Sequence, residues 1–236
     1  MSNNKPIRRI AIIGTGVIGA SWTALFLAKG LEVVATDIAP NAEAVAEDDS
    51  WRRPGRRSSD WASSPGASQS NLTFTAALAG KRSRGADLVQ ENGPERIDFK
   101  QKLYGQLDEL LPPDVIIASS SSGLTMSEIQ SGAASHPERC VIAHPFNPPH
   151  LIPLVEIVGG AKTSEATIRR AAEFYTSIGQ RTVRLNKEMP GHVANRLQAA
   201  LAREVYYLVA EGVVSAADVD TALCWGRACA GASWAT

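Results

Sequence analysis

A glycine-rich turn between an apolar run and a helical pattern is the feature that most constrains this chain. The turn Gly14-Thr15-Gly16-Val17-Ile18-Gly19 follows the β-branched run Ile7 to Ile13 and opens a helical pattern that extends to Lys29. The first glycine permits a tight turn, the second lets the backbone approach a pyrophosphate, and the third allows close packing of helix on strand. Because the helix N-terminus then faces an anion, the motif predicts a dinucleotide site. Its cofactor-binding residues are Gly14, Gly16, Val17, Ile18 and Gly19.

The acidic residue after the next apolar run indicates which dinucleotide is bound. Asp37 directly follows the run Leu31 to Thr36 and lies 18 residues after Gly19. At that position a carboxylate accepts hydrogen bonds from the adenine-ribose 2′-OH and repels a 2′-phosphate. We therefore expect NAD rather than NADP as the cofactor.

The rest of the chain alternates between strand and helix patterns before it becomes helical. Further strands are predicted at 87–90, 115–119, 140–144 and 180–185, and helices at 96–110, 124–131 and 163–178. Such alternation predicts an α/β protein with a Rossmann-type, doubly wound, mostly parallel sheet. From Pro190 one apolar face continues to Gly212, and Ser215 with Asp218 is typical of a capping box. We expect an NAD-binding domain at 1–186 and the start of an all-helical domain at 187–236.

Composition excludes several functional classes. Lys plus Arg and Asp plus Glu number 24 each, so no net charge favours nucleic acid or an anionic membrane as a partner. Neither a signal peptide at MSNNKPIRRI nor an apolar run of about 18 residues is present, which predicts a soluble protein. Three cysteines, an odd number, favour a reducing compartment, and the cytoplasm is expected. Cys224 and Cys229 lack the partners of a zinc site, so no metal is expected.

A histidine at the end of a predicted strand is the first candidate for chemistry. His144 ends the run that begins at Cys140, and Glu156 follows twelve residues later. Ligand crevices form at the carboxyl ends of parallel strands. An imidazole held by a carboxylate suits a dehydrogenase, because removal of a hydroxyl proton is easier when the imidazolium is stabilised. Taken alone, a His and a Glu at this separation are more often two unrelated structural residues.

Several motifs in register resemble the 3-hydroxyacyl-CoA dehydrogenase family. They are the glycine turn, Glu91-Asn92-Gly93-Pro94-Glu95-Arg96-Ile97-Asp98-Phe99-Lys100, Ser119 to Gly123, His144-Pro145-Phe146-Asn147-Pro148 with Glu156, and Pro190-Gly191-His192-Val193-Ala194-Asn195-Arg196-Leu197. The resemblance covers about residues 7–40 and 71–226. Four consecutive serines at 119–122 make the chain more similar to the lambda-crystallin (L-gulonate 3-dehydrogenase) and L-carnitine dehydrogenase branch.

The resemblance implies a role for each matching residue. His144 is the catalytic base and Glu156 the carboxylate that orients it. Ser122 and Asn195 hydrogen-bond the reacting oxygen or the histidine, and Asn147 lies on the substrate side. Glu95 and Lys100 line the nicotinamide end of the cofactor. The implied activity is NAD-dependent oxidation of the 3-hydroxyl of an L-3-hydroxyacyl-CoA or a small L-3-hydroxy acid to the 3-oxo compound, by a homodimer.

Two segments depart from the family pattern. The family continues after Trp225-Gly226 with Pro-Gly, whereas this chain has a patternless sequence at 227–236; an Arg-, Ser- and Trp-rich stretch at 51–65 replaces an amphipathic helix. A shifted reading frame in both segments, with a truncated helical domain, is our hypothesis for these departures.

Two other functions compete with this interpretation. One is a non-catalytic, crystallin-like NAD-binding protein or an inactive truncated protein. The chain retains the residues to which the resemblance gives catalytic roles, which argues against this alternative: His144, Glu156, Ser122 and Asn195. The other is a β-hydroxy-acid dehydrogenase, which would use a lysine base in its helical domain. The sequence argues against it, because no Lys lies near Asn195 after Lys187.

Overall fold

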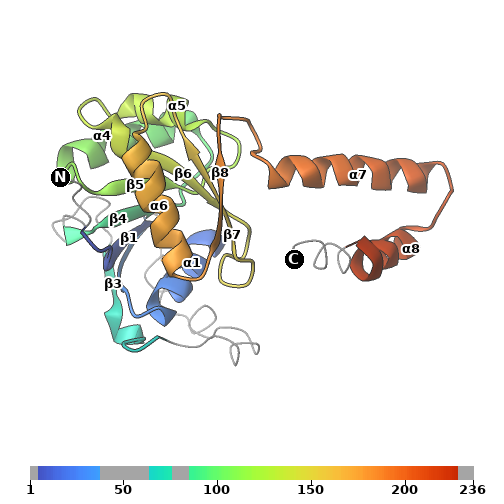
Figure 1. Cartoon of the computed structure of the whole chain (residues 1–236), viewed down its shortest axis with the longest axis horizontal. Helices are drawn as coiled ribbons and strands as arrows, with labels where there is room; N and C mark the ends of the chain where they lie inside the picture. The colour runs from blue at the N-terminus through green and yellow to red at the C-terminus, as the bar shows by residue number, and fades with distance from the viewer. Residues whose placement is uncertain (1–4, 38–63, 76–84, 228–236) are drawn as a thin grey trace. The chain divides into compact units, whose positions relative to one another are not determined.

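An eight-stranded sheet organises the larger part of the protein (Figure 1). The structure is a computed structural model that describes residues 5–37, 64–75 and 85–227. Strand order is β3-β2-β1-β4-β5-β6-β7-β8. The strands are β1 (Arg9–Ile13), β2 (Glu32–Thr36), β3 (Leu72–Thr75), β4 (Leu88–Glu91), β5 (Ile116–Ser119), β6 (Cys140–Pro145), β7 (Leu154–Gly159) and β8 (Arg181–Leu185). The main helices are α1 (Val17–Ala28), α4 (Ile97–Leu110), α5 (Met126–Ile129), α6 (Glu165–Ser177), α7 (Ala194–Ala210) and α8 (Ala216–Thr221).

The sheet is mostly parallel, which confirms the predicted α/β class. All neighbouring strands from β3 to β6 pair parallel, as do β7 and β8. Only β6 and β7 pair antiparallel. The eight residues 146–153 between them are too few for the crossover that a parallel pair requires. The short connection therefore turns the chain back beside β6.

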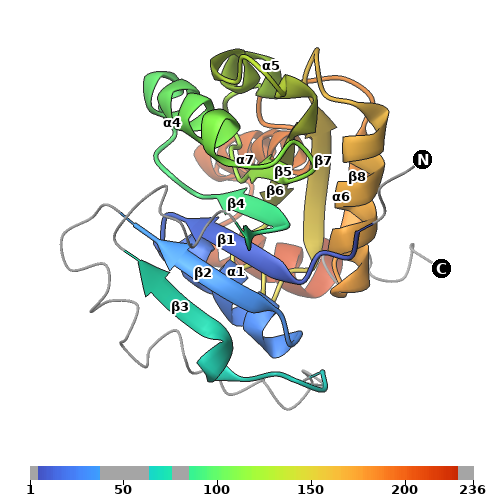
Figure 2. The same ribbon diagram turned by 90° about the vertical axis from the view of Figure 1, so that its left-hand side faces the viewer.

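Two hydrophobic clusters cover the two faces of the sheet. Figure 2 shows helices on both sides of the strands, with α4 and α5 on one side and α1 on the other. Successive residues of β1 alternate between them: Ile10 and Ile12 pack with α1 and α6, whereas Ala11 and Ile13 pack with α4 and α5. This alternation follows from the period of two in a strand, with both faces buried. Trp22 of α1, fully buried and stacked on Phe26 at 5.2 Å between ring centroids, anchors one cluster.

Most predicted elements lie within two residues of the observed ones; the exceptions are the helix at 124–131 and the strands β3 and β7, neither of which was predicted. The helix expected at 124–131 is only one turn, α5, followed by a 3₁₀ turn at Gln130–Gly132; its start at Thr125 is a capping box with Glu128. Strand β3 was not expected: its sequence Leu72-Thr73-Phe74-Thr75 alternates apolar and polar residues over only four positions, all of them half-buried. Most of the irregular stretch 51–65, and the tail from 228 onward, lie outside the described residues.

The chain divides into two compact units, Met1–Pro190 and Gly191–Thr236. The second unit contains α7, α8 and a π-helical turn at Ala222–Arg227. Ser215 caps α8, since its hydroxyl oxygen accepts the Asp218 N–H at 3.1 Å and its O–H donates to the Asp218 carboxylate at 2.7 Å. Helix α7 contains no buried residue, and Leu197 on its predicted apolar face is 67% exposed.

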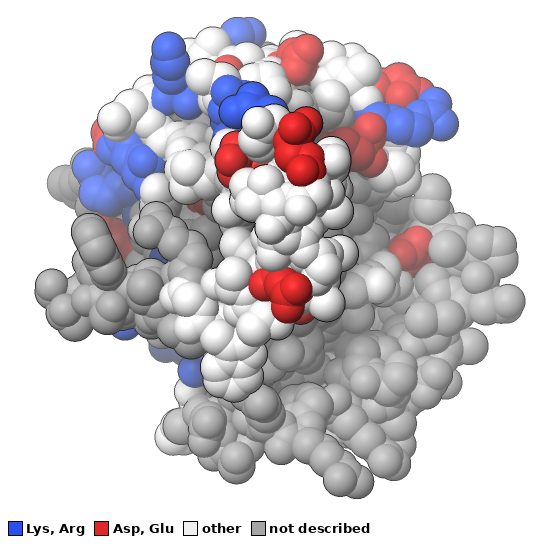
Figure 3. All heavy atoms as spheres, turned by 90° about the vertical axis from the view of Figure 1, so that its right-hand side faces the viewer, with Lys and Arg blue, Asp and Glu red and all other residues white. Residues whose placement is uncertain are grey.

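Charges of both signs are distributed over the described surface. Figure 3 shows blue and red side chains interspersed among uncharged ones on the coloured part of the face in view. Among the described helices, none has the length and apolar character needed to cross a membrane. The described residues also hold no cluster of three or more His, Cys, Asp or Glu suited to a metal ion.

Candidate active site

The glycine turn lies at the carboxyl end of β1, directly before α1. Gly14 has φ +85° and donates its N–H to the Thr36 carbonyl at 2.9 Å, so the turn is tied to the end of β2. A Cβ on Gly19 would lie 1.9 Å from the Gly14 carbonyl oxygen, which restricts this position to glycine. A Cβ on Gly16, in contrast, would meet nothing within 4 Å. The backbone at Gly16 is therefore open to a ligand.

The start of α1 has the features of an anion site. No side chain caps this helix at Gly16, and its first turn contains no acidic residue. Val17, in that turn, is 71% exposed. Uncapped backbone N–H groups and the positive end of the helix dipole attract a phosphate. These residues fit the pyrophosphate of a dinucleotide.

Asp37 directly follows β2, beside the glycine turn. Its Oδ2 accepts the Thr15 backbone N–H at 2.6 Å and the Thr15 hydroxyl at 3.0 Å. The half-buried carboxylate is thus fixed next to the turn that would hold a pyrophosphate. In a fold of this type, an acidic residue at the carboxyl end of the second strand lies where the adenine ribose of the cofactor binds.

His144 and Glu156 lie directly opposite one another on the antiparallel strands β6 and β7. The imidazole Nδ1 is 2.9 Å from Glu156 Oε2. Glu156 is only 1% exposed and His144 only 7%, so the pair is shielded from water. Phe146 contacts the imidazole edge-on, with 6.2 Å between ring centroids. The carboxylate fixes the ring orientation and stabilises a proton on it, which is the arrangement a general base needs.

The consecutive serines begin with Ser119, the last residue of β5, and differ in their environments. Ser119 is buried and donates to Glu91 Oε2 at 2.6 Å. Ser120 Oγ accepts from Gln90 Nε2 at 2.9 Å and donates to Asn92 Oδ1 at 2.7 Å. Ser122 is half-buried, and its backbone N–H donates to Glu95 Oε1 at 3.0 Å. Of the serine side chains in this run, that of Ser122 is therefore the most accessible.

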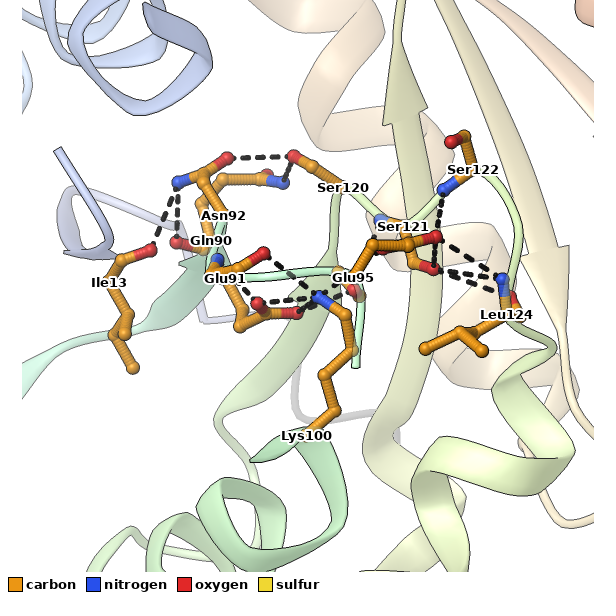
Figure 4. A network of polar contacts seen from close by, with 12 residues as sticks. Ile13, Gln90, Glu91, Asn92, Glu95, Lys100, Ser120, Ser121, Ser122 and Leu124 are labelled. Carbon is orange, nitrogen blue, oxygen red and sulfur yellow. Dashed lines mark hydrogen bonds and ion pairs between the residues drawn. The ribbon is translucent and has the colours of Figure 1, made fainter. Parts of the chain in front are cut away.

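Glu95 and Lys100 come from the segment between β4 and the first turns of α4 (Figure 4). The Lys100 ammonium is 2.7 and 2.8 Å from the two oxygens of Glu91 and 3.8 Å from Glu95 Oε2. Lys100 is 1% exposed and Glu91 is fully buried. Lys100 therefore lies beneath the surface of the site, where it pairs with these two carboxylates. The sequence analysis assigned no role to Glu91, although an acidic residue directly after an apolar strand pattern was a signal for one.

The two asparagines lie in different parts of the chain. Asn147 is exposed in the segment between β6 and β7, three residues after His144. Asn195 is half-buried in the first turn of α7, within the second unit. Unit 1 therefore contains the glycine turn, Asp37, the serines, His144 and Glu156, and unit 2 contains Asn195.

Comparison with known proteins defines the class to which this fold and site belong. Residues 9–189 match the family model for the NAD-binding domain of 3-hydroxyacyl-CoA dehydrogenase, and residues 191–235 match its C-terminal domain. The chain belongs to the 3-hydroxyacyl-CoA dehydrogenase family and is an NAD-dependent oxidoreductase.

Two relatives of known name are similar to this chain over nearly its whole length. An L-carnitine dehydrogenase from Pseudomonas putida is 45% identical over 97% of this chain and 69% of its own length. A 3-hydroxyacyl-CoA dehydrogenase from Gibberella moniliformis is 44% identical over 97% of this chain and 69% of its own. The predicted family, cofactor and enzyme class are thereby confirmed.

Two solved structures share the fold. The NAD⁺-dependent dismutase FHMPC 5-dehydrogenase superposes with a TM-score of 0.79 at 38% identity, over 94% of this chain and 71% of that one. An (S)-3-hydroxybutyryl-CoA dehydrogenase from Ralstonia eutropha gives a TM-score of 0.76 at 26% identity, over 94% and 78% of the two chains.

Proposed function

We propose that the protein oxidises the 3-hydroxyl group of a small L-3-hydroxy acid or of an L-3-hydroxyacyl-CoA to the 3-oxo compound, with NAD as oxidant. The observation that carries this proposal is the buried His144–Glu156 pair, 2.9 Å apart, in a chain of an NAD-dependent dehydrogenase family. A pair of this kind suits removal of a hydroxyl proton as hydride leaves the same carbon.

His144 acts as the general base in this proposal. Glu156 binds its Nδ1, so the other ring nitrogen, Nε2, takes the proton of the C3 hydroxyl. NAD held by the glycine turn and Asp37 would supply the acceptor for the hydride from C3. The buried carboxylate then stabilises the imidazolium. Ser122 and Asn195 hydrogen-bond the reacting oxygen or the imidazole, and Asn147 contacts the substrate. Reduction of the 3-oxo compound follows the same path in reverse.

The cofactor contacts follow from the turn at the start of α1. The glycine turn holds the pyrophosphate, because it leaves the N-terminus of α1 uncapped and the backbone at Gly16 open. The residues that make these contacts are Gly14, Gly16, Val17, Ile18 and Gly19. Asp37 binds the adenine ribose. Glu95 and Lys100 lie at the nicotinamide end, as the family resemblance implies.

L-Carnitine is the first substrate to examine, and an L-3-hydroxyacyl-CoA is the second. Seven relatives at 42–45% identity have the name L-carnitine dehydrogenase, and one at 44% has the name 3-hydroxyacyl-CoA dehydrogenase. The family resemblance also implies a homodimer, and its predicted signature is a doubled mass by light scattering.

The test is NADH formation with L-carnitine, D-carnitine and (S)-3-hydroxybutyryl-CoA, each supplied with NAD. We expect turnover of one L-configured substrate and none of D-carnitine. Binding of NAD by calorimetry with no turnover of any substrate in the panel would contradict the proposal and favour a non-catalytic NAD-binding protein.

A further inference from the structure

One carboxylate oxygen holds the backbone of the segment that carries Ser122. We name residues Ser121–Leu124 the serine loop. Glu95 Oε1 accepts the Ser121 hydroxyl at 2.6 Å and the backbone N–H groups of Ser122, Gly123 and Leu124 at 3.0, 2.6 and 3.3 Å. Three successive N–H groups around one anion form a concave nest, which fixes the backbone of the segment. Figure 4 shows the Glu95 side chain reaching this loop.

The other end of the same network is buried. Glu91 ends β4 and accepts hydrogen bonds from Ser119 Oγ and the Gly93 N–H, both at 2.6 Å. Lys100 links this carboxylate to that of Glu95. The serine loop is therefore connected through Glu95 and Lys100 to the end of a core strand. It is not connected through a strand ladder, since β5 ends at Ser119.

The contacts of Glu95 favour its ionised form. Burial raises the pKa of this carboxyl group, but the Ser121 hydroxyl, the Gly123 N–H, the Lys100 charge and the Leu124 N–H together hold the pKa below its usual value. Hydrogen bonds to an ionised acceptor are about twice as strong as those to a neutral one. The hydrogen bonds that converge on Glu95 and the negative charge of its carboxylate thus both favour a fixed serine loop.

We propose that Glu95 is a positioning residue, whose carboxylate holds the serine loop in the conformation that presents Ser122 to the reacting oxygen. Lys100 assists through Glu91 and Glu95. This inference rests on the proposed function, in which Ser122 hydrogen-bonds the reacting oxygen or the imidazole. It assigns Glu95 an effect on the chemical step that passes through the loop, separate from any effect on cofactor affinity.

The kinetic test compares Glu95→Ala and Glu95→Gln with a matched control. The control, Glu109→Gln, removes an exposed negative charge from α4, the helix that follows Glu95. We expect Glu95→Ala to lower kcat by about 10²-fold, the effect of a misplacement of about 1 Å. Glu95→Gln retains an acceptor oxygen and should lose about tenfold. In the two Glu95 variants kcat at saturating NAD should fall by a larger factor than the dissociation constant for NAD rises, and in Glu109→Gln both should be unchanged. A loss of NAD affinity in Glu95→Ala with kcat at saturating NAD unchanged would leave Glu95 a cofactor contact alone and overturn the proposal.

Hydrogen exchange of the serine-loop amides tests the same proposal without turnover. Exchange at residues 122–124 should accelerate at least about tenfold in Glu95→Ala and be unchanged in Glu109→Gln. Unchanged exchange in Glu95→Ala would refute the positioning role. If the unaltered chain turns over no substrate, the proposed function fails, and with it the catalytic side of this inference; the exchange rates still decide whether Glu95 holds the loop.

Discussion

At the scale of single residues, Asp37 is the side chain best placed to select the cofactor. We expect Asp37→Ala to shift the ratio of NAD to NADP affinity toward NADP by about tenfold, equivalent to about 1.4 kcal/mol, because a negative charge beside the ribose is removed. Glu32→Ala, at the exposed opposite end of β2, is the matched control. Titration of each variant with both nucleotides measures the ratio. Equal affinity of the unaltered chain for NAD and NADP would contradict this role.

Glu156 should be essential for rate and dispensable for cofactor binding. Glu156→Gln keeps the shape of the side chain but removes the charge that stabilises the imidazolium. We expect kcat to fall by about 10²- to 10⁴-fold, in the range known for the acid of a Ser-His-Asp triad. Calorimetric NAD affinity should be unchanged. A normal kcat in this variant would show that the carboxylate has only a structural role.

The sequence predicted which residues form this pair better than it predicted how they meet. Residues twelve apart become neighbours only because β6 and β7 form an antiparallel ladder that pairs His144 with Glu156. Hydrophobic patterns specify burial, but not strand direction or register. Likewise, Lys100 belongs to a motif visible in the sequence, whereas its nearly complete burial against Glu91 depends on tertiary packing.

At the scale of elements, the order of strands and helices could be predicted wherever the period was clear. The segment from β1 to β2 was predicted within two residues, because apolar runs alternate there with glycine stops. Strand β3 lacks such a run, and α5 is too short for helical periodicity to show. Contacts with the neighbouring strands and the capping box at Thr125 specify these two elements.

A buried carboxylate near the end of α4 connects this helix to the segment before β6. Asp108 accepts from the Ser135 N–H at 2.7 Å and from the buried Arg139 guanidinium at 2.9 Å. Burial raises the pKa of Asp108, but hydrogen bonds from Ser135, Arg139 and His136 lower it below its usual value. A lowered native pKa stabilises the fold fully above the unfolded-state pKa of about 3.9, and this stabilisation is lost as pH falls through the native value.

Asp108→Asn should therefore destabilise the protein at neutral pH and flatten its acid dependence. The variant leaves Arg139 buried without its anion, and the loss should be about 3–5 kcal/mol. Urea unfolding between about pH 7 and pH 3 measures both effects. Glu109→Gln, an exposed neighbour, is the control. A stability difference from the unaltered chain that stays constant as the pH falls below about 4 would contradict the role of Asp108.

At the scale of the whole molecule, the two units divide the proposed functions between them. Both hydrophobic clusters, the glycine turn and Asp37 belong to unit 1, and Asn195 belongs to unit 2. We expect residues 1–190, expressed alone, to bind NAD within about threefold of the full chain and to show no measurable turnover. Calorimetry and the NADH assay test the two parts. Full turnover by this fragment would remove unit 2 from the reaction.

Replacement of His144 tests the central claim most directly. We expect His144→Ala to lower turnover of the L-3-hydroxy substrate by about 10²- to 10⁴-fold, the usual contribution of a general base. NAD affinity should be nearly unchanged, since the imidazole does not hold the cofactor. His136→Ala, which removes a partly exposed imidazole beside Glu138, should keep full activity. Undiminished NADH formation by His144→Ala would contradict the account.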